Sequence, residues 1–193
     1  MVADRAKIMP MREILQKFYS AKYITSLDLS SAVLQVPIKQ SSRQWTAFQF
    51  ESNVYQFKTV PYGFKNSRAA FIRALEKVLR DCDLKNSLVM YVDDLLHSSN
   101  LTEHLHHIDL VLDELTSAGF TVNAAMCQYC KTEIKFLGHV ISDGVKAGRE
   151  RIEAILRYPV PKNQRQLRKF LGMCNFLQHF ILNYASYVEP LLS

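Results

Sequence analysis

Two adjacent carboxylates stand near the middle of the chain, in the tetrad Tyr91-Val92-Asp93-Asp94, between the apolar runs 88–90 and 95–96. Burying one unpaired carboxylate costs several kcal/mol, and two side by side also repel each other. A bound divalent cation would relieve both costs. An ordinary hairpin turn is the alternative, because Asp is common in turns and the flanking residues are typical of strands.

A third carboxylate, Asp28, follows the run of β-forming residues 23–27. If the strand before Asp28 and a strand beside Asp93 are neighbours in one sheet, the strands lie about 4.8 Å apart. Carboxylates at such strand ends can share two metal ions roughly 3.5–4 Å apart, which is the arrangement used in phosphoryl transfer. Other two-metal enzymes satisfy the same pattern, so the spacing alone leaves the reaction open.

Helices and hairpins are predicted around these carboxylates. Apolar residues at helical spacing predict helices over about residues 10–20, from Asn66 or Ser67 onward, and from a Thr102 N-cap to just before Gly119. In the helix that starts at Thr102 we expect an inner face made of Leu105, Ile108, Leu112 and Leu115. Its three histidines spread around the helix, so we expect them to face solvent and not to form a metal cluster; they are His104, His106 and His107.

Runs of β-forming residues predict two hairpins. One joins residues 45–50 to 54–57, and another spans 134–141 and ends at the turn pair Asp143-Gly144. From about residue 145 the chain becomes helical and basic, and Asn163 is suited to cap the final helical segment. We therefore expect a mixed α+β unit over 1–145 and a small helical unit over 146–193, without a flexible linker.

Composition limits the class of protein. A chain of 193 residues with 48% hydrophobic residues can bury a core, so disorder is not expected. We find no apolar run of about 18 residues and no signal-peptide pattern, and we expect an intracellular protein, cytoplasmic or nuclear, without membrane contact or secretion. Cys127 and Cys130 have the spacing of metal ligands, but a second pair is missing, so we do not expect zinc.

Positive charge points to a polyanionic partner. The formal net charge is +6 and the pI is about 9.1. Basic residues gather between Lys146 and Lys169, where only Glu150 and Glu153 oppose them. This stretch is the best candidate for contact with a phosphate backbone. Its proposed backbone contacts are Lys146, Arg149, Arg165, Arg168 and Lys169.

Four sequence blocks fall in the order found in retroelement reverse transcriptases. They are YITSLDLSS (23–31), VPYGFKNS (60–67), YVDD (91–94) and FLGH (136–139). The segment FLGMCNF (170–176) also resembles the thumb of that family. The resemblance is strongest to the gypsy class of long-terminal-repeat retrotransposons and runs from about residue 4 to the C-terminus.

This resemblance implies a right-hand polymerase. Residues 1–145 would form partial fingers and a palm, an antiparallel sheet packed on helices, and residues 146–193 would form a helical thumb. The metal ligands would be Asp28, Asp93 and Asp94 with the Leu29 carbonyl, holding two Mg²⁺ ions, with Mn²⁺ as an alternative. Residues bordering the incoming nucleotide would be Val33, Pro61, Tyr62 and Gly63. The primer grip would be Phe136, Leu137, Gly138 and His139, although core packing would also explain Phe136 and Leu137.

The implied activity is that of a nucleotidyltransferase, an RNA-directed DNA polymerase. It would add deoxynucleotides from their triphosphates to a primer on an RNA or DNA template. Companion domains in a retroelement polyprotein would be a protease, an RNase H and an integrase.

Two departures from the family favour a different reading. Only 27 residues precede Asp28, and we expect them to be shorter than the family's fingers and to lack the basic residues that grip the triphosphate. Val33 replaces the usual Tyr or Phe, which predicts poor rejection of ribonucleotides. The main alternative is a retroelement-derived domain that no longer polymerises and binds nucleic acid or protein. An RNA-dependent RNA polymerase gains support only from Val33.

Overall fold

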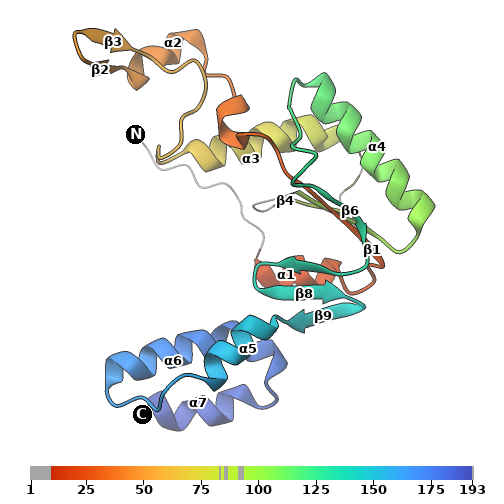
Figure 1. Cartoon of the computed structure of the whole chain (residues 1–193), viewed down its shortest axis with the longest axis vertical. Coiled ribbons are helices and arrows are strands. Elements are labelled where there is room, and N and C mark those ends of the chain that lie inside the picture. The colour runs from red at the N-terminus through yellow and green to blue at the C-terminus, as the bar shows by residue number, and fades with distance from the viewer. Residues whose placement is uncertain (1–9, 83, 85–86, 91–93, 193) are drawn as a thin grey trace. The chain divides into compact units, whose positions relative to one another are not determined.

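The chain folds into two compact units, residues 1–132 and 133–193 (Figure 1). The structure is a computed structural model that describes residues 10–82, 84, 87–90 and 94–192. Its strand pairs are antiparallel and its helices lie outside the sheets, as the predicted α+β class requires. The second unit begins at residue 133, because the strands of 134–147 form a sheet of their own.

The first unit is built on a four-stranded sheet with the order β4-β5-β1-β6. These strands are β1 (Tyr23–Leu27), β4 (Leu88–Met90), β5 (Asp94–Ser98) and β6 (Gln128–Lys131). The helices are α1 (Met11–Lys17), α2 (Gln40–Arg43), α3 (Ser67–Val78) and α4 (Leu101–Ser117). Short 3₁₀ turns are η1 (Ala32–Gln35), η2 (Gln44–Thr46) and η3 (Leu79–Cys82).

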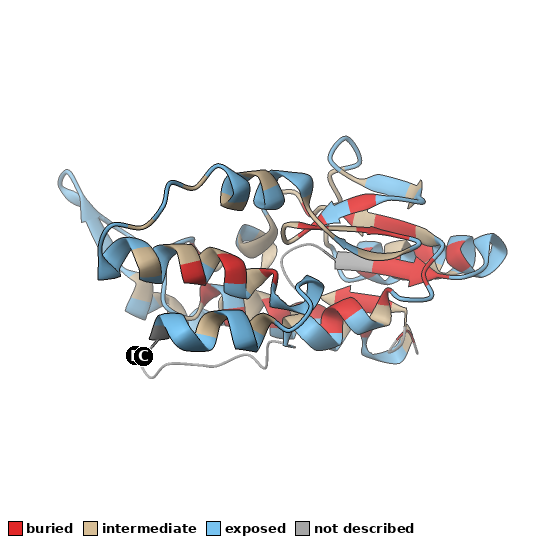
Figure 2. Ribbon diagram, turned by 90° about the horizontal axis from the view of Figure 1, so that it is seen from below, coloured by how far each residue is buried: buried red, intermediate tan, exposed pale blue. Residues whose placement is uncertain are grey.

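Alternation along β1 places Thr25, Leu27 and Leu29 on one buried face of the sheet. Helix α4 contacts β1 and β5, and contributes Val111 and Leu115 to the same core. Figure 2 shows buried residues in the sheet strands, whereas the hairpin β2 (Phe48–Phe50) and β3 (Asn53–Tyr55) is exposed throughout. The core of this unit therefore surrounds the central strand that leads to Asp28.

The N-cap of helix α4 and the face of α4 that is buried against the sheet both differ from the prediction. Asn100, and not Thr102, is its N-cap, because the Asn100 side chain accepts hydrogen bonds from the N–H groups of Thr102 and Glu103. The buried face keeps the expected Ile108 and Leu115, but His104 and Val111 take the places expected for Leu105 and Leu112.

His104 is therefore buried, contrary to the prediction, while His106 is exposed.

Among the described residues, no helix is both long enough and apolar enough to cross a membrane.

The second unit is a three-stranded sheet, in the order β7-β8-β9, followed by helices. Its strands are β7 (Ile134–Phe136), β8 (His139–Ser142) and β9 (Gly144–Ala147). Its helices are α5 (Arg149–Leu156), α6 (Gln164–Phe176) and α7 (Tyr184–Leu192), with the 3₁₀ turn η4 (Gln178–Phe180). The predicted Asn163 cap of α6 is confirmed, since its side chain accepts from the Gln166 N–H.

Two glycines bring the β7–β8 turn against the start of α5. The Gly148 N–H donates to the Gly138 carbonyl at 3.1 Å. A Cβ at Gly148 would lie 2.5 Å from that same oxygen, closer than real Cβ contacts allow. Gly148 itself has φ −64°, a value any residue adopts, so the constraint is the close approach and not the backbone angle.

We expect Gly148→Ala to destabilise the second unit by about 1–3 kcal/mol, the usual cost of forcing an extra methyl group into a packed contact. Gly172→Ala in α6 is the matched control, because nothing lies within 4 Å of its added Cβ. Alanine at a helical glycine should stabilise by roughly 0.5–1 kcal/mol. Thermal unfolding followed by circular dichroism measures both, and equal melting temperatures for the two variants would contradict the steric account.

Acid should destabilise the first unit through His97. Burial lowers the pKa of His97 from 6.5 to about 4, and the nearby positive charges of Lys17, His104 and His107 add to the effect. The unfolded chain binds the proton more readily than the folded chain. The contribution of neutral His97 to the free energy of unfolding is therefore fully present above pH 6.5 and is lost as the pH drops toward 4. The loss at pH 4 should be on the order of 3 kcal/mol.

Urea unfolding at pH 7 and pH 4.5 checks this expectation. His97→Leu should flatten the pH dependence, whereas His106→Gln, which alters an exposed histidine, should leave it unchanged. The same slope in the unaltered chain and in His97→Leu would exclude His97 as its source.

Candidate metal centre and nucleic-acid interface

The pairing of β1 with β5 brings two of the predicted carboxylate positions to one end of the sheet. Leu27, the last residue of β1, pairs with Asp94, the first residue of β5. Asp28 follows Leu27 directly, so Asp28 and Asp94 lie at the same end of neighbouring antiparallel strands. The expected strand neighbourhood is confirmed. Asp93 lies outside the described residues, as do Tyr91 and Val92.

The main chain around Asp28 is held on the side opposite β5. The Asp28 carbonyl accepts from the Asn123 N–H at 2.8 Å, and the Ser30 N–H donates to the Thr121 carbonyl at 2.9 Å. These two bonds flank the bridge between Leu29 and Val122. Because successive carbonyls of an extended strand alternate in direction, the Leu29 carbonyl points away from Val122.

Sequence reasoning missed a contact at this position. The Asp28 N–H donates to the Cys127 sulfur at 3.3 Å. The spacing of Cys127 to Cys130 gives no sign of this contact, because the Cys127 sulfur bonds the main chain by itself. Among the described residues no group of three or more His, Cys, Asp or Glu side chains gathers to hold a metal.

The predicted metal ligands at this end of the sheet, the Asp28 and Asp94 carboxylates and the Leu29 carbonyl, are oxygen donors that suit a hard divalent cation. Asp28 is half-buried, which leaves part of its surface available to a ligand. Carboxylates and a main-chain carbonyl are the donors that Mg²⁺ prefers, usually with retained water molecules. The residues at this end of the sheet therefore fit a Mg²⁺ site in the chemistry of their donors.

The segment around Pro61 is tied to the turn that carries Val33. The Val60 N–H donates to the Val36 carbonyl at 2.9 Å, and the Val36 N–H donates to the Val33 carbonyl at 3.2 Å. Val33 lies half-buried in η1. The structure thus joins the two parts of the predicted nucleotide-binding set.

Within that segment, Tyr62 is 59% exposed and Gly63 has φ +83°. The Ser67 hydroxyl donates to the Pro61 carbonyl at 2.6 Å, which closes the turn onto the start of α3. The left-handed φ at position 63 favours glycine there.

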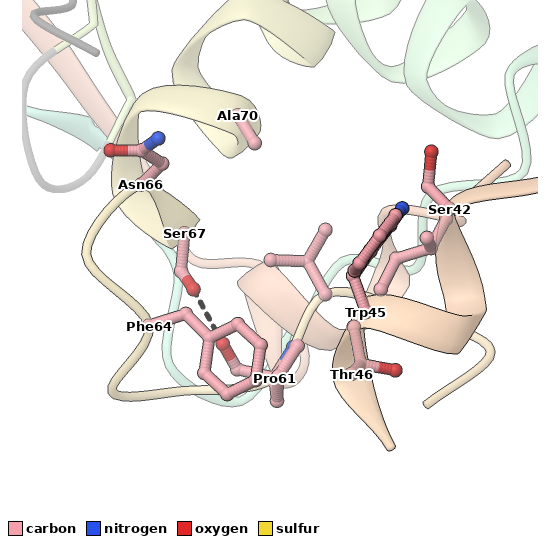
Figure 3. A pocket seen from close by; sticks show the side chains of 10 residues that line it. Ser42, Trp45, Thr46, Pro61, Phe64, Asn66, Ser67 and Ala70 are labelled. Atoms are coloured by element: carbon pink, nitrogen blue, oxygen red, sulfur yellow. Dashed lines mark hydrogen bonds between the residues drawn. The ribbon is translucent and has the colours of Figure 1, made fainter. Parts of the chain in front are cut away.

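An apolar cavity of about 570 Å³ lies beside this turn (Figure 3). Trp45 and Phe64 contribute aromatic surface to it, and the Ser67 to Pro61 hydrogen bond forms part of its wall. Trp45 is 78% exposed, so the cavity opens to solvent on an aromatic edge.

The FLGH block forms a tight turn in the second unit. Phe136 pairs with His139, and Leu137 and Gly138 both have positive φ, +49° and +81°, as a type I′ hairpin turn requires. Phe136 and His139 are buried, and the His139 ring lies against those of Phe176 and Phe180. Burial leaves the turn, and not these two side chains, as the surface of the predicted primer grip.

The predicted phosphate-contacting residues are all exposed. Lys146 lies in β9, Arg149 in α5, and Arg165, Arg168 and Lys169 in α6. Arg149 pairs with Glu153 at 2.9 Å, an exposed ion pair that contributes little to stability. A further cation, Arg151, lies over the Phe176 ring at 4.8 Å and close to Gly138.

A family model described as "Reverse transcriptase (RNA-dependent DNA polymerase)" matches residues 3–141 of the chain. Curated relatives include the retrovirus-related Pol polyproteins from transposon 297, 35% identical over 100% of this chain, and from transposon gypsy, 33% identical over 98%, both of Drosophila melanogaster. The chain spans 18% of the length of each of these polyproteins.

Solved structures agree with the sequence relatives. A foamy viral protease-reverse transcriptase in complex with double-stranded DNA matches all of this chain with a TM-score of 0.85 and 27% identity, over 34% of its own length. The foamy viral enzyme in complex with an RNA/DNA hybrid matches 99% of this chain with a TM-score of 0.78 and 27% identity, over 26% of its own length. The resemblance inferred from the four blocks is thereby confirmed, and the chain belongs to the reverse transcriptase (RNA-dependent DNA polymerase) family.

Proposed function

We propose that this chain is the RNA-directed DNA polymerase domain of a retrotransposon, and that it extends a primer by metal-assisted nucleotidyl transfer. The observation that carries the proposal is the β1–β5 pairing, which puts Asp28 and Asp94 at one end of the sheet in a chain of the reverse transcriptase family. Asp93 would complete the ligand set, with the Leu29 carbonyl.

The metal ligands would hold Mg²⁺, or Mn²⁺ in its place. Bound ions would lower the pKa of the primer 3′-hydroxyl and neutralise charge on the leaving pyrophosphate. The protein contributes position and charge: Asp28 and Asp94 are fixed by strand pairing, and Tyr62 and Gly63 stand on a turn closed by Ser67. Val33 would border the sugar of the incoming deoxynucleoside triphosphate.

The second unit would hold the primer and the phosphate backbone. The Leu137-Gly138 turn, with Phe136 and His139 packed beneath it, would support the primer 3′ end. The exposed cations of β9, α5 and α6 would neutralise phosphates of a template-primer duplex, so binding should weaken as salt rises. Partnership with protease, RNase H or integrase domains is part of this proposal, since the relatives are polyproteins.

A binding module without polymerase activity is the second candidate. The exposed cations of the second unit favour it, because binding a phosphate backbone needs no metal site. The two functions separate cleanly, since only polymerisation depends on the carboxylates.

Primer extension on an RNA template with Mg²⁺ or Mn²⁺ tests the polymerase. The Asp93→Asn/Asp94→Asn variant and Asp28→Asn should each reduce extension by at least about 100-fold, the scale seen when one electrostatic group leaves an active site. Asp109→Asn, which changes an exposed carboxylate on α4, is the matched control and should extend normally.

Fluorescence anisotropy of a labelled template-primer serves as the second readout. The carboxylate variants should bind it as the unaltered chain does when metal is left out. No extension by the unaltered chain, together with intact binding, would replace the polymerase with the binding module.

Val33→Phe should raise selectivity for deoxynucleotides over ribonucleotides by about tenfold or more, because a ring at this position would collide with a ribose 2′-hydroxyl. Leu34→Phe in the same 3₁₀ turn is the control, since Leu34 is exposed and has no assigned contact with the sugar. The ratio of kcat/KM for the two nucleotide types is the measurement. Equal or better selectivity in the unaltered chain would refute the role of Val33.

A further inference from the structure

Strand β1 is irregularly paired with β6 just before Asp28. Ile24 pairs with Lys131 and Ser26 pairs with Gln128, so two steps on β1 face three on β6. The extra residue makes a β-bulge, and Cys130 within it has φ +48°. A bulge leaves a main-chain group without its ladder partner, and that group needs another one when it is buried.

Thr25 supplies that partner. The Cys130 N–H donates to Thr25 Oγ1 at 3.0 Å. Thr25 Oγ1 also lies 2.8 Å from His104 Nε2 of helix α4, and both residues are fully buried. Because Thr25 accepts from Cys130, its own proton can be donated to a neutral His104, and burial lowers the pKa of His104, which favours the neutral form. One hydroxyl thus joins β1, β6 and α4.

Cys127 makes the second attachment, at Asp28 itself. Its sulfur accepts the Asp28 N–H at 3.3 Å and lies 3.9 Å from the Asp28 carbonyl oxygen. The Asn123 N–H donates to that same carbonyl, and the Cys127 N–H donates back to the Asn123 carbonyl at 3.2 Å. The turn between Asn123 and Cys127 therefore grips both main-chain polar groups of Asp28.

We propose that Thr25 and Cys127 are positioning residues that fix the main chain of Asp28 and, through it, the metal site. This inference rests on the proposed function, because Asp28 must be a metal ligand for its position to matter. Metal ligands have to be held within about 0.5 Å of their working geometry by groups that bond them from behind. Thr25 lies on β1, three residues before Asp28, and Cys127 lies just before β6, where its sulfur accepts the Asp28 N–H.

The same geometry explains the Cys-x-x-Cys spacing without a metal. Cys127 acts through its sulfur, whereas Cys130 acts through its N–H. A zinc pair would use both sulfurs. The spacing reflects the end of a turn followed by a bulge, so the two cysteines should respond differently to substitution.

Binding of Mn²⁺ to the full chain, followed by the electron paramagnetic resonance signal of the free ion, tests the inference. Thr25→Val and Cys127→Ala should each lower the affinity about tenfold or more, the range for losing a group behind a metal ligand. Thr25→Ser keeps the hydroxyl and should restore the affinity of the unaltered chain. Cys130→Ala keeps its N–H and is the matched control, with unchanged affinity.

Hydrogen exchange of the amides in residues 24–29 gives a readout that does not need metal. Exchange there should accelerate in Thr25→Val and Cys127→Ala, while exchange in α3 stays as in the unaltered chain. If Thr25→Val fails to unfold cooperatively, Cys127→Ala carries the test, because its half-buried sulfur is removed without leaving a buried hydroxyl partner unpaired.

Three results would overturn the proposal. Unchanged affinity in both Thr25→Val and Cys127→Ala, with normal Asp28-dependent binding in the unaltered chain, excludes a positioning role. Equal losses in Cys127→Ala and Cys130→Ala point to a paired-cysteine site instead. If Asp28→Asn binds Mn²⁺ as well as the unaltered chain does, the proposed function fails. In that case, unchanged hydrogen exchange of residues 24–29 in Thr25→Val and Cys127→Ala would reject the positioning contacts as well.

Discussion

The antiparallel pairing of β1 with β5 is the interaction on which the rest of the first unit depends. Its register, with Leu27 opposite Asp94, decides which residues face the core and which stand at the open end of the sheet. A slip of one residue would turn Thr25, Leu27 and Leu29 toward the opposite face and remove Asp28 from its place. Burial of Leu27 and Leu29 beneath α4 therefore fixes the register and the acidic end together.

The features that local sequence determines were predictable. Apolar residues at helical spacing from Ser67 onward mark α3, and the Asn163 cap marks the start of α6, because helical periodicity and capping act within a few residues. The neighbourhood of Asp28 and Asp94 was also predictable, since carboxylates at the ends of two apolar runs have few ways to share a sheet. The four ordered sequence blocks are enough to indicate the family, which the family model confirms.

What remained depended on contacts between distant residues. Which face of α4 is buried is decided by the sheet beneath it, and Thr25 on that sheet supplies the hydroxyl that lets His104 lie inside. The bulge in β6 and the contact of Cys127 with Asp28 have no local signal, because they compensate for pairing with a strand about a hundred residues away. The third strand of the second sheet, β9, likewise follows from its pairing with β8, which short-range patterns do not reveal.

The hairpin of β2 and β3 differs from the other sheets in a way that affects the local stability of the domain and its tendency to self-associate. All its residues are exposed, several are aromatic, and among the described residues it pairs with no third strand. A two-stranded sheet is only marginally stable in water, so it can open without unfolding the four-stranded sheet. Opening would present two unpaired, apolar strand edges to other copies, which makes this hairpin the point from which self-association and proteolytic nicking would begin while the acidic end of the sheet stays folded.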